Sequence, residues 1–231
     1  MSIVWNFPAI SILLCLFAGI VSSGLSGKSA RRLNTVLMIT VLVLSAATLK
    51  YASGLGESVV YVMGRFPAPW GNELRFGVLE AGMATFFAVI MILSMLGGHH
   101  KLSEEVESRQ HNLYYVLVDL LLSSLLALIY TNDIFTAYVF VEINTIAACG
   151  LIMIRGIGRT IEAAVRYMIM SLIGSGMLLM GICILYDITG HLLMSNMKTA
   201  IAGLVIDGTY PVALLVSITL ICVGLAIKSA L

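Results

Sequence analysis

The chain has 231 residues and a net charge of +1, and 60% of its residues are hydrophobic while only 11% are charged, against about 25% in soluble domains. This composition indicates an integral membrane protein, and the near-neutral charge gives no sign of a nucleic-acid or other polyanionic partner. The four cysteines lie in apolar segments without a CxxC pair, so neither a metal site nor a disulfide framework is expected.

Apolar segments of about 20 residues are long enough to cross a bilayer. They predict an all-α polytopic membrane protein with about seven transmembrane helices, forming a single membrane domain over residues 1–231. The expected helices cover residues 5–21, 33–50, 78–96, 113–130, 134–154, 160–185 and 211–231. No basic residue precedes the first segment, so it is interpreted as a retained helix rather than a signal peptide. Because the polar segments are short, we expect no active site in this chain and no redox cofactor.

Residues 53–77 differ from the rest of the chain in being rich in glycine and proline. Residues 59–63 and 74–76 favour β-strands, and residues 67–72 have the composition of a turn. A short ordered β-hairpin on the outer surface is one interpretation. An irregular loop with Trp70 at the level of the lipid headgroups is the other.

The most polar segment, residues 97–112, is interpreted as a solvated loop. It contains three histidines and three glutamates, His99, His100, His111, Glu104, Glu105 and Glu107. Their spacing matches no standard metal-ligand pattern, so no metal is expected there.

The fifth span begins at a polar turn. Thr131 and Asn132 form the turn, and Asp133 supplies the N-cap of the helix that follows. Further along the chain, residues 187–209 form an outer loop in which residues 192–204 are expected to form a short surface helix.

The distribution of basic residues predicts that the amino end lies outside the membrane, because inner loops are richer in lysine and arginine. The inner set is Lys28, Arg31, Arg32, Lys101, Arg109, Arg155 and Arg159, and the outer set is Lys50, Arg65, Arg75 and Lys198. The hairpin is then outside and residues 97–112 are inside.

Three ionisable residues inside apolar spans need an explanation beyond packing, namely Glu142, Lys228 and Asp119. A charge at the centre of a membrane helix costs at least about 2.5 to 3.5 kcal/mol on insertion scales. Glu142 lies roughly 13 Å along its helix, close to the middle of the membrane. Burial disfavours the charged form of a lone acid or base, whereas pairing Glu142 with Lys228 favours both charged forms.

A buried acid and base whose separation can change form a proton switch. The alternative is a static ion pair that holds helices together. Small polar residues near the pair, namely Asn144, Thr145, Ser171 and Ser175, are candidates either for lining water or for contacts between helices.

Four motifs, in order along the chain, resemble the antiporter-like subunits of respiratory complex I, Mrp-type antiporters and energy-converting hydrogenases. Asp-Ile-Phe-Thr-Ala-Tyr-Val-Phe-Val-Glu at residues 133–142 resembles the family's fifth-helix motif. Residues 162–167, followed by Gly174 and Ser175, resemble the next signature, and residues 224–228 resemble the start of the seventh-helix lysine motif. Residues 66–74 are most similar to Mrp D-type and hydrogenase members.

The resemblance implies that Glu142 and Lys228 are the family's switch pair. Glu80 stands where members often have an acid opening the third helix, and Arg166 stands where they usually have lysine. No role for Asp119 follows from the motifs. The candidate ion-translocation residues are Glu142, Lys228, Asp119, Arg166 and Glu80.

The chain departs from the family pattern at its end. Members usually have about fourteen helices, including two inverted repeats, and a Pro-x-His-x-Trp-Leu-Pro segment follows the lysine. Here the sequence stops at Leu231. A fragment or split gene product is therefore expected, with a neighbouring chain supplying the second half of the fold.

These observations predict a proton- or sodium/proton-translocating subunit of a larger complex in a prokaryotic inner membrane. Its partners would be other membrane subunits and the lipid bilayer. A structural anchor that passes no ions is the alternative from a different class. An independent small-solute carrier is disfavoured, because the chain has no inverted-repeat partner half.

Overall fold

The computed structural model describes residues 3–66, 71–107 and 110–229, apart from the side chains of residues 3, 65, 99–101 and 103. Within these ranges, seven helices are long and apolar enough to cross a membrane, so the chain is an all-α polytopic membrane protein. They are α1 Phe7–Gly24, α2 Gly27–Leu55, α3 Val78–Glu105, α4 His111–Tyr130, α5 Ile134–Met153, α6 Gly158–Thr189 and α8 Pro211–Lys228. A short 3-10 helix, Ile3–Asn6, precedes α1.

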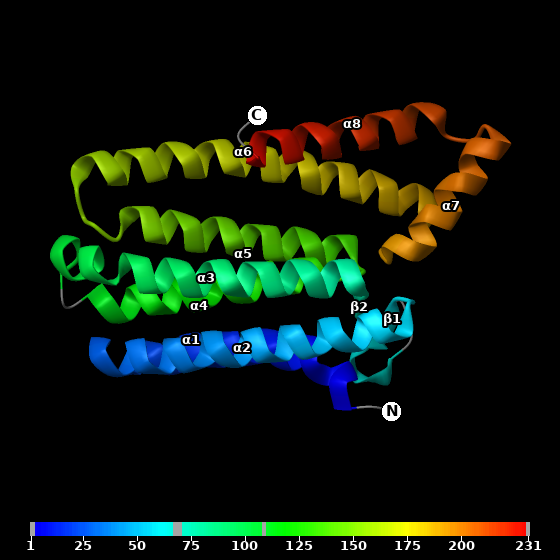
Figure 1. The fold of residues 1–231 in the computed structure, drawn as a ribbon. Coiled ribbons are helices and arrows are strands. Elements are labelled where there is room, and N and C mark those ends of the chain that lie inside the picture. Colours follow the sequence, from blue (N-terminus) through cyan, green and yellow to red (C-terminus); the bar gives the residue numbers. More distant parts are fainter. Residues whose placement is uncertain (1–2, 67–70, 108–109, 230–231) are drawn as a thin grey trace.

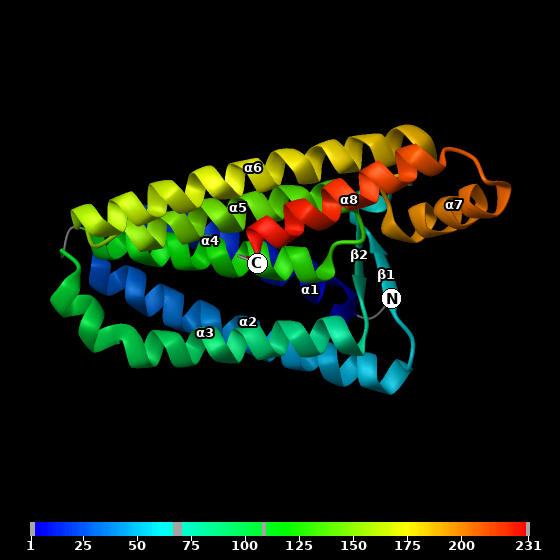
Figure 2. The same cartoon turned by 90° about the horizontal axis from the view of Figure 1, so that it is seen from above.

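The seven helices form one bundle whose members run along a common direction (Figures 1 and 2). Helix α1 packs on α2 and α4, α5 lies between α4 and α6, and α8 packs mainly on α6. The apolar core lies among the first four helices, where Met38, Val41, Leu122 and Leu126 are buried. Helices α5, α6 and α8 lie outside this core.

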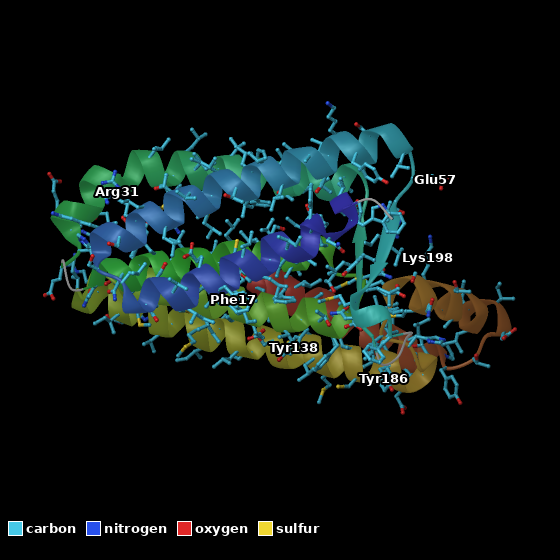
Figure 3. The ribbon with its side chains drawn as sticks, turned by 90° about the horizontal axis from the view of Figure 1, so that it is seen from below. Phe17, Arg31, Glu57, Tyr138, Tyr186 and Lys198 are labelled. Carbon is cyan, nitrogen blue, oxygen red and sulfur yellow. The ribbon has the colours of Figure 1, made fainter. Side chains whose placement is uncertain are left out.

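The two ends of the bundle differ in charge. The basic end carries the α1–α2 and α5–α6 connections, with Lys28, Arg31, Arg32, Arg155 and Arg159. The opposite end, here called the hairpin end, carries the amino terminus, a β-hairpin and α7 Met194–Asp207 (Figure 1). Figure 3 shows Arg31 at one end and Glu57 and Lys198 at the other, with Phe17 and Tyr138 between them. The polar groups at the two ends and the apolar middle are the pattern expected of a membrane bundle.

The hairpin interpretation is confirmed. Strands β1 Val59–Val62 and β2 Glu73–Phe76 pair antiparallel, with Val59 opposite Phe76 and Val62 opposite Glu73. Phe76 and Leu74 are buried in the bundle core, so one face of the hairpin closes the hairpin end. The turn expected at residues 67–72 falls largely outside the described residues, as does Trp70.

Asn132 ties the hairpin, the α4–α5 turn and α7 together. Its backbone N–H donates to the carbonyl of Glu73 at 2.9 Å, and its carbonyl accepts from the N–H of Met194 at 2.8 Å. Its side-chain amide donates to the Glu73 carboxylate at 3.1 Å and to the Ser195 hydroxyl at 3.2 Å. Because Asn132 is buried, this connection is shielded from competing water.

Asp133 is the N-cap of α5, as the sequence predicts, and its carboxylate accepts from the N–H of Thr136 at 2.6 Å. Replacing Asp133 with alanine should cost about 1 kcal/mol, because this N–H loses its partner. Asp133→Asn, which can still cap, should cost much less. Thermal unfolding of the purified protein measures both, with the exposed Asp187→Ala as control. Equal melting temperatures for the alanine and asparagine variants would contradict the capping role.

Several helix boundaries differ from those expected. Helix α3 continues to Glu105, so the expected loop at residues 97–112 is mostly helical. Lysine, leucine and glutamate there are good helix formers, and no proline stops the helix at the Gly97–Gly98 pair. Helices α2 and α6 are also longer than expected, because they continue into polar residues at the ends of the bundle. The side chains of His99, His100 and Lys101 and all of Arg109 lie outside the described part.

Candidate ion-translocation site

Glu142 and Lys228 meet inside the bundle. Glu142 lies near the middle of α5, and Lys228 is the last residue of α8. The Lys228 Nζ atom lies 2.6 Å from Glu142 Oε1, and the two side chains are 8% and 23% exposed. The acid and base that the sequence singles out as buried therefore form a direct ion pair.

Hydroxyl groups complete the surroundings of the ion pair. Lys228 Nζ donates to Thr145 Oγ1 at 3.3 Å and to Ser171 Oγ at 3.2 Å. Ser175 donates from its hydroxyl to Glu142 Oε1. The ammonium thus has three oxygen partners for its three protons, and these contacts satisfy a charge that would be costly if it were buried alone.

The four helical positions involved lie at the same depth. Ser171 and Ser175 are in the middle of α6, and Thr145 follows Glu142 by one turn of α5. Figure 1 shows that α8 ends beside the middle of α6. Lys228 therefore lies deep inside the bundle rather than at the membrane surface.

Close backbone packing between α6 and α8 positions Lys228. A Cβ atom on Gly224 would lie 2.7 Å from the Gly174 carbonyl oxygen and 2.8 Å from the Leu178 nitrogen, and a Cβ atom on Gly181 would lie 2.8 Å from the Ser217 carbonyl oxygen. Only glycine allows the two helices to approach this closely. Lys228 follows Gly224 by one helical turn, so this crossing determines where the lysine lies.

Asp119 is fully buried but has different partners. Its carboxyl accepts hydrogen bonds from the Asn34 amide and, at 3.4 Å, from the Ser22 hydroxyl. These residues lie on α2 and α1. Among the ion pairs of the described residues, none includes Asp119 or joins it to Glu142 and Lys228.

Glu80 and Arg166 have local partners. The Glu80 carboxylate accepts from the N–H of Gly77 at 2.8 Å and so caps the start of α3. Arg166 forms an ion pair with Glu162 at 2.5 Å, and both side chains are exposed, at 78% and 63%. Neither contacts the Glu142–Lys228 pair, and a part for either in ion translocation stays a prediction.

Two features of these sites were not anticipated from the sequence. The partners of Asp119 were missed, although Asn34 is an isolated amide within an apolar segment. The glycine crossing was also missed, although Gly174 and Gly181 lie seven residues apart, on one face of a helix. Asn144, named as a candidate, forms none of the hydrogen bonds of the described pair.

The geometry can now be compared with known proteins. The family model described as NADH:quinone oxidoreductase/Mrp antiporter, transmembrane, matches residues 131–231, which contain both Glu142 and Lys228. NADH-quinone oxidoreductase subunit N of Desulforudis audaxviator is 32% identical over 198 residues, which are 85% of this chain and 38% of the relative. The chain belongs to the antiporter-like subunit family.

Other members of the antiporter-like family agree with this assignment. The D-type Na(+)/H(+) antiporter protein of Bacillus subtilis is 27% identical over 140 residues, covering 61% of this chain and 28% of that protein. The structure of the membrane-bound sulfane sulfur reductase, an archaeal respiratory membrane complex, contains a chain with the same fold. The TM-score is 0.84 at 24% identity, over 98% of this chain and 44% of that one. This chain thus spans less than half the length of these relatives.

Proposed function

We propose that the Glu142–Lys228 pair is a proton switch in an ion-translocating subunit of a multisubunit membrane complex. The observation that carries the proposal is the direct contact of the two charges, 2.6 Å apart at the middle of the bundle. A charge pair at this depth is costly to insert and occurs mostly where it lines an ion pathway. Membership of the antiporter-like family supports an ion-translocating role in general.

The switch works by separation of the two charges. While Lys228 contacts Glu142, each charge stabilises the other. If Lys228 moves away, Glu142 keeps only the Ser175 hydroxyl, and its carboxylate takes up a proton because burial disfavours the unpaired charge. Lys228 keeps the neutral oxygens of Thr145 and Ser171, and its ammonium can release a proton for the same reason. Restoring the contact reverses both changes.

The remaining features of the proposal follow from family membership and charge distribution. The ion path would continue in membrane segments beyond residues 1–231, in neighbouring subunits or in a longer chain, because the relatives are more than twice as long as this chain. The positive-inside rule supports an amino end outside. A prokaryotic inner membrane is the proposed location, and a proton, alone or in exchange for sodium, is the proposed ion.

The test is ion transport by the assembled complex carrying Glu142→Gln. Glutamine keeps the size and accepts the Ser175 hydrogen bond, but it cannot take up a proton. We expect loss of proton transport with normal assembly, measured with a pH-sensitive dye in vesicles containing the purified complex.

The matched control is Glu162→Gln, which changes an exposed glutamate on α6 and should leave transport unchanged. An anchor without ion transport predicts equal proton fluxes for wild type and Glu142→Gln, and that result would contradict the switch.

A further inference from the structure

Asp119 forms a second buried acidic site, away from the Glu142–Lys228 pair. Its side chain is fully buried in α4, where Asn34 of α2 and Ser22 of α1 are also fully buried. Asp119 and Leu117 are two residues apart and so point to nearly opposite faces of α4. Leu117 packs against Gly150 of α5, so Asp119 faces away from the helix that carries Glu142.

The surroundings of Asp119 favour a neutral acid. In the described part of the chain, its hydrogen-bond donors are two uncharged groups, the Asn34 amide and the Ser22 hydroxyl. On the elements around it, Cys15 of α1 interacts with it electrostatically, Arg31 of α2 is exposed one turn from Asn34, and Cys149 and Glu142 lie on α5. A buried carboxylate without a cationic partner is more stable when it binds a proton.

Asn34 carries the decisive feature. Its Oδ1 atom is buried and has no hydrogen-bond partner, although its Nδ2 atom donates to Asp119. A buried acceptor without a partner costs about 1 to 3 kcal/mol. The amide group has nearly the same shape after half a turn about its Cβ–Cγ bond, so the turn exchanges donor and acceptor with little movement of other atoms. Asn34 can therefore donate to a carboxylate in one orientation and accept the proton of a carboxylic acid in the other.

We propose that Asp119, Asn34 and Ser22 form a proton-binding site that holds Asp119 as a neutral carboxylic acid. Protonation forms an O–H bond on the carboxylate, and the Asn34 amide turns so that Oδ1 accepts this hydrogen. Release of the proton restores the donation from Nδ2. Ser22 adapts to both states, because a hydroxyl is both donor and acceptor.

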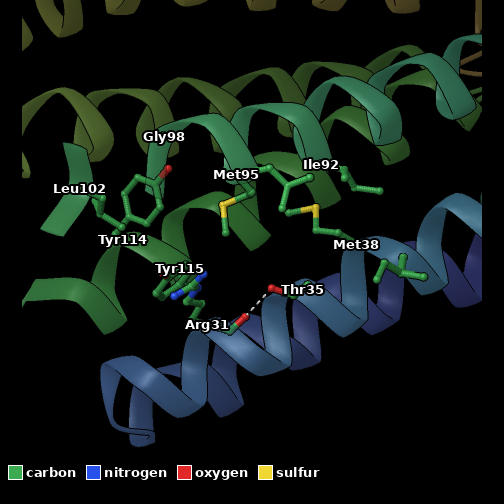
Figure 4. Close-up of a pocket in the computed structure, with 11 residues that line it drawn as sticks. Arg31, Thr35, Met38, Ile92, Met95, Gly98, Leu102, Tyr114 and Tyr115 are labelled. Atoms are coloured by element: carbon green, nitrogen blue, oxygen red, sulfur yellow. Dashed lines mark hydrogen bonds between the residues drawn. The ribbon is translucent and has the colours of Figure 1, made fainter. Parts of the chain in front are cut away.

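A cavity one helical turn away provides the approach for the proton. It has a volume of about 120 Å³ and lies between α2, α3 and α4 toward the basic end (Figure 4). Arg31 and Met38 of its lining flank Asn34 on the same face of α2, and Tyr115 precedes Asp119 by one turn of α4. Figure 4 shows the Arg31 and Thr35 side chains on one side of this space and Tyr114 on the other. Polar atoms at this end of the cavity can hold water that delivers protons.

Protonation of Asp119 follows from these contacts alone, whereas its use in transport rests on the proposed function above. Infrared spectroscopy of the purified complex tests the first point, because a protonated carboxyl has a carbonyl stretch that shifts when the sample is exchanged into D2O. We expect such a band in wild type and in Glu142→Gln, and its loss in Asp119→Asn. A wild-type spectrum that contains no band lost in Asp119→Asn would overturn the proposal.

Proton transport tests the second point. Asp119→Asn keeps the size and the hydrogen-bonding capacity of the acid but cannot exchange a proton, so we expect transport to fall at least about tenfold, with partial recovery in Asp119→Glu. The matched control is Ser123→Ala, which removes another buried hydrogen bond between α4 and α1, from Ser123 to the Ile12 carbonyl at 3.2 Å. Wild-type transport by Asp119→Asn, or an equal loss in Ser123→Ala, would show that Asp119 only joins helices. Neither result would bear on Glu142→Gln, so the two proposals fail separately.

Discussion

Replacing Lys228 with alanine should abolish ion transport and destabilise the protein by about 3 to 5 kcal/mol, the cost of leaving one member of a buried ion pair without its partner. Glu142 would keep only the Ser175 hydroxyl, and Thr145 and Ser171 would lose the ammonium that both of them accept. Thermal unfolding of the purified complex measures the stability, and dye-monitored proton uptake into vesicles measures the transport.

A double variant separates these two effects. Lys228→Met combined with Glu142→Leu removes both charges, and replacing a buried ion pair by apolar side chains of similar size is often neutral or stabilising. We therefore expect the melting temperature to return near that of wild type while transport stays absent. The control is Lys198→Ala on the surface of α7, which should change neither quantity. Normal transport by Lys228→Ala or by the double variant would show that the ion pair only joins helices.

The second large effect is expected from Gly224→Leu. Its Cβ atom would meet backbone atoms of Gly174 and Leu178 at 2.7 and 2.8 Å, and backbone cannot rotate away as a side chain can. Overpacking typically costs about 1 to 3 kcal/mol. We expect α8 to move away from α6, so that Lys228, one turn further on, loses Glu142 and transport falls together with stability.

Gly176→Leu is the matched control for this crossing. It introduces the same side chain on α6, but no atom lies within 4 Å of the added Cβ. Melting temperature and proton transport should both stay close to wild type. If Gly224→Leu and Gly176→Leu behave alike, the close approach of α6 and α8 does not position Lys228.

The spans, the hairpin strands and the α5 cap could be predicted because each depends on neighbouring residues. Long apolar segments, β-branched residues between glycines and an aspartate before an apolar run act locally. The end of α3 was wrong for a related reason. Polarity was taken as a sign of a loop, whereas the residues after Gly98 are polar but form helices well.

The site was predictable only in part. Glu142 and Lys228 were found because charges are rare in apolar spans, and their sequence motifs suggested the pairing. The contact between Asp119 and Asn34 joins residues 85 positions apart, and no local pattern specifies such a pair. The Gly174–Gly224 approach depends on how α8 crosses α6 and has the same limitation. Arg166 lies in an exposed pair with Glu162, which its position near a helix end did not predict.

The attachment of the hairpin end has a mechanical consequence for α8. Asn132 links the start of α7 to the hairpin and to α5, so the base of α8 is anchored while its length rests mainly on one neighbour, α6. An 18-residue helix is about 27 Å long, and a tilt of about 5° about its base would displace its last residue by roughly 2 Å. A small angular deflection at this anchorage would therefore be geared up into a gap wide enough to uncouple the two charges.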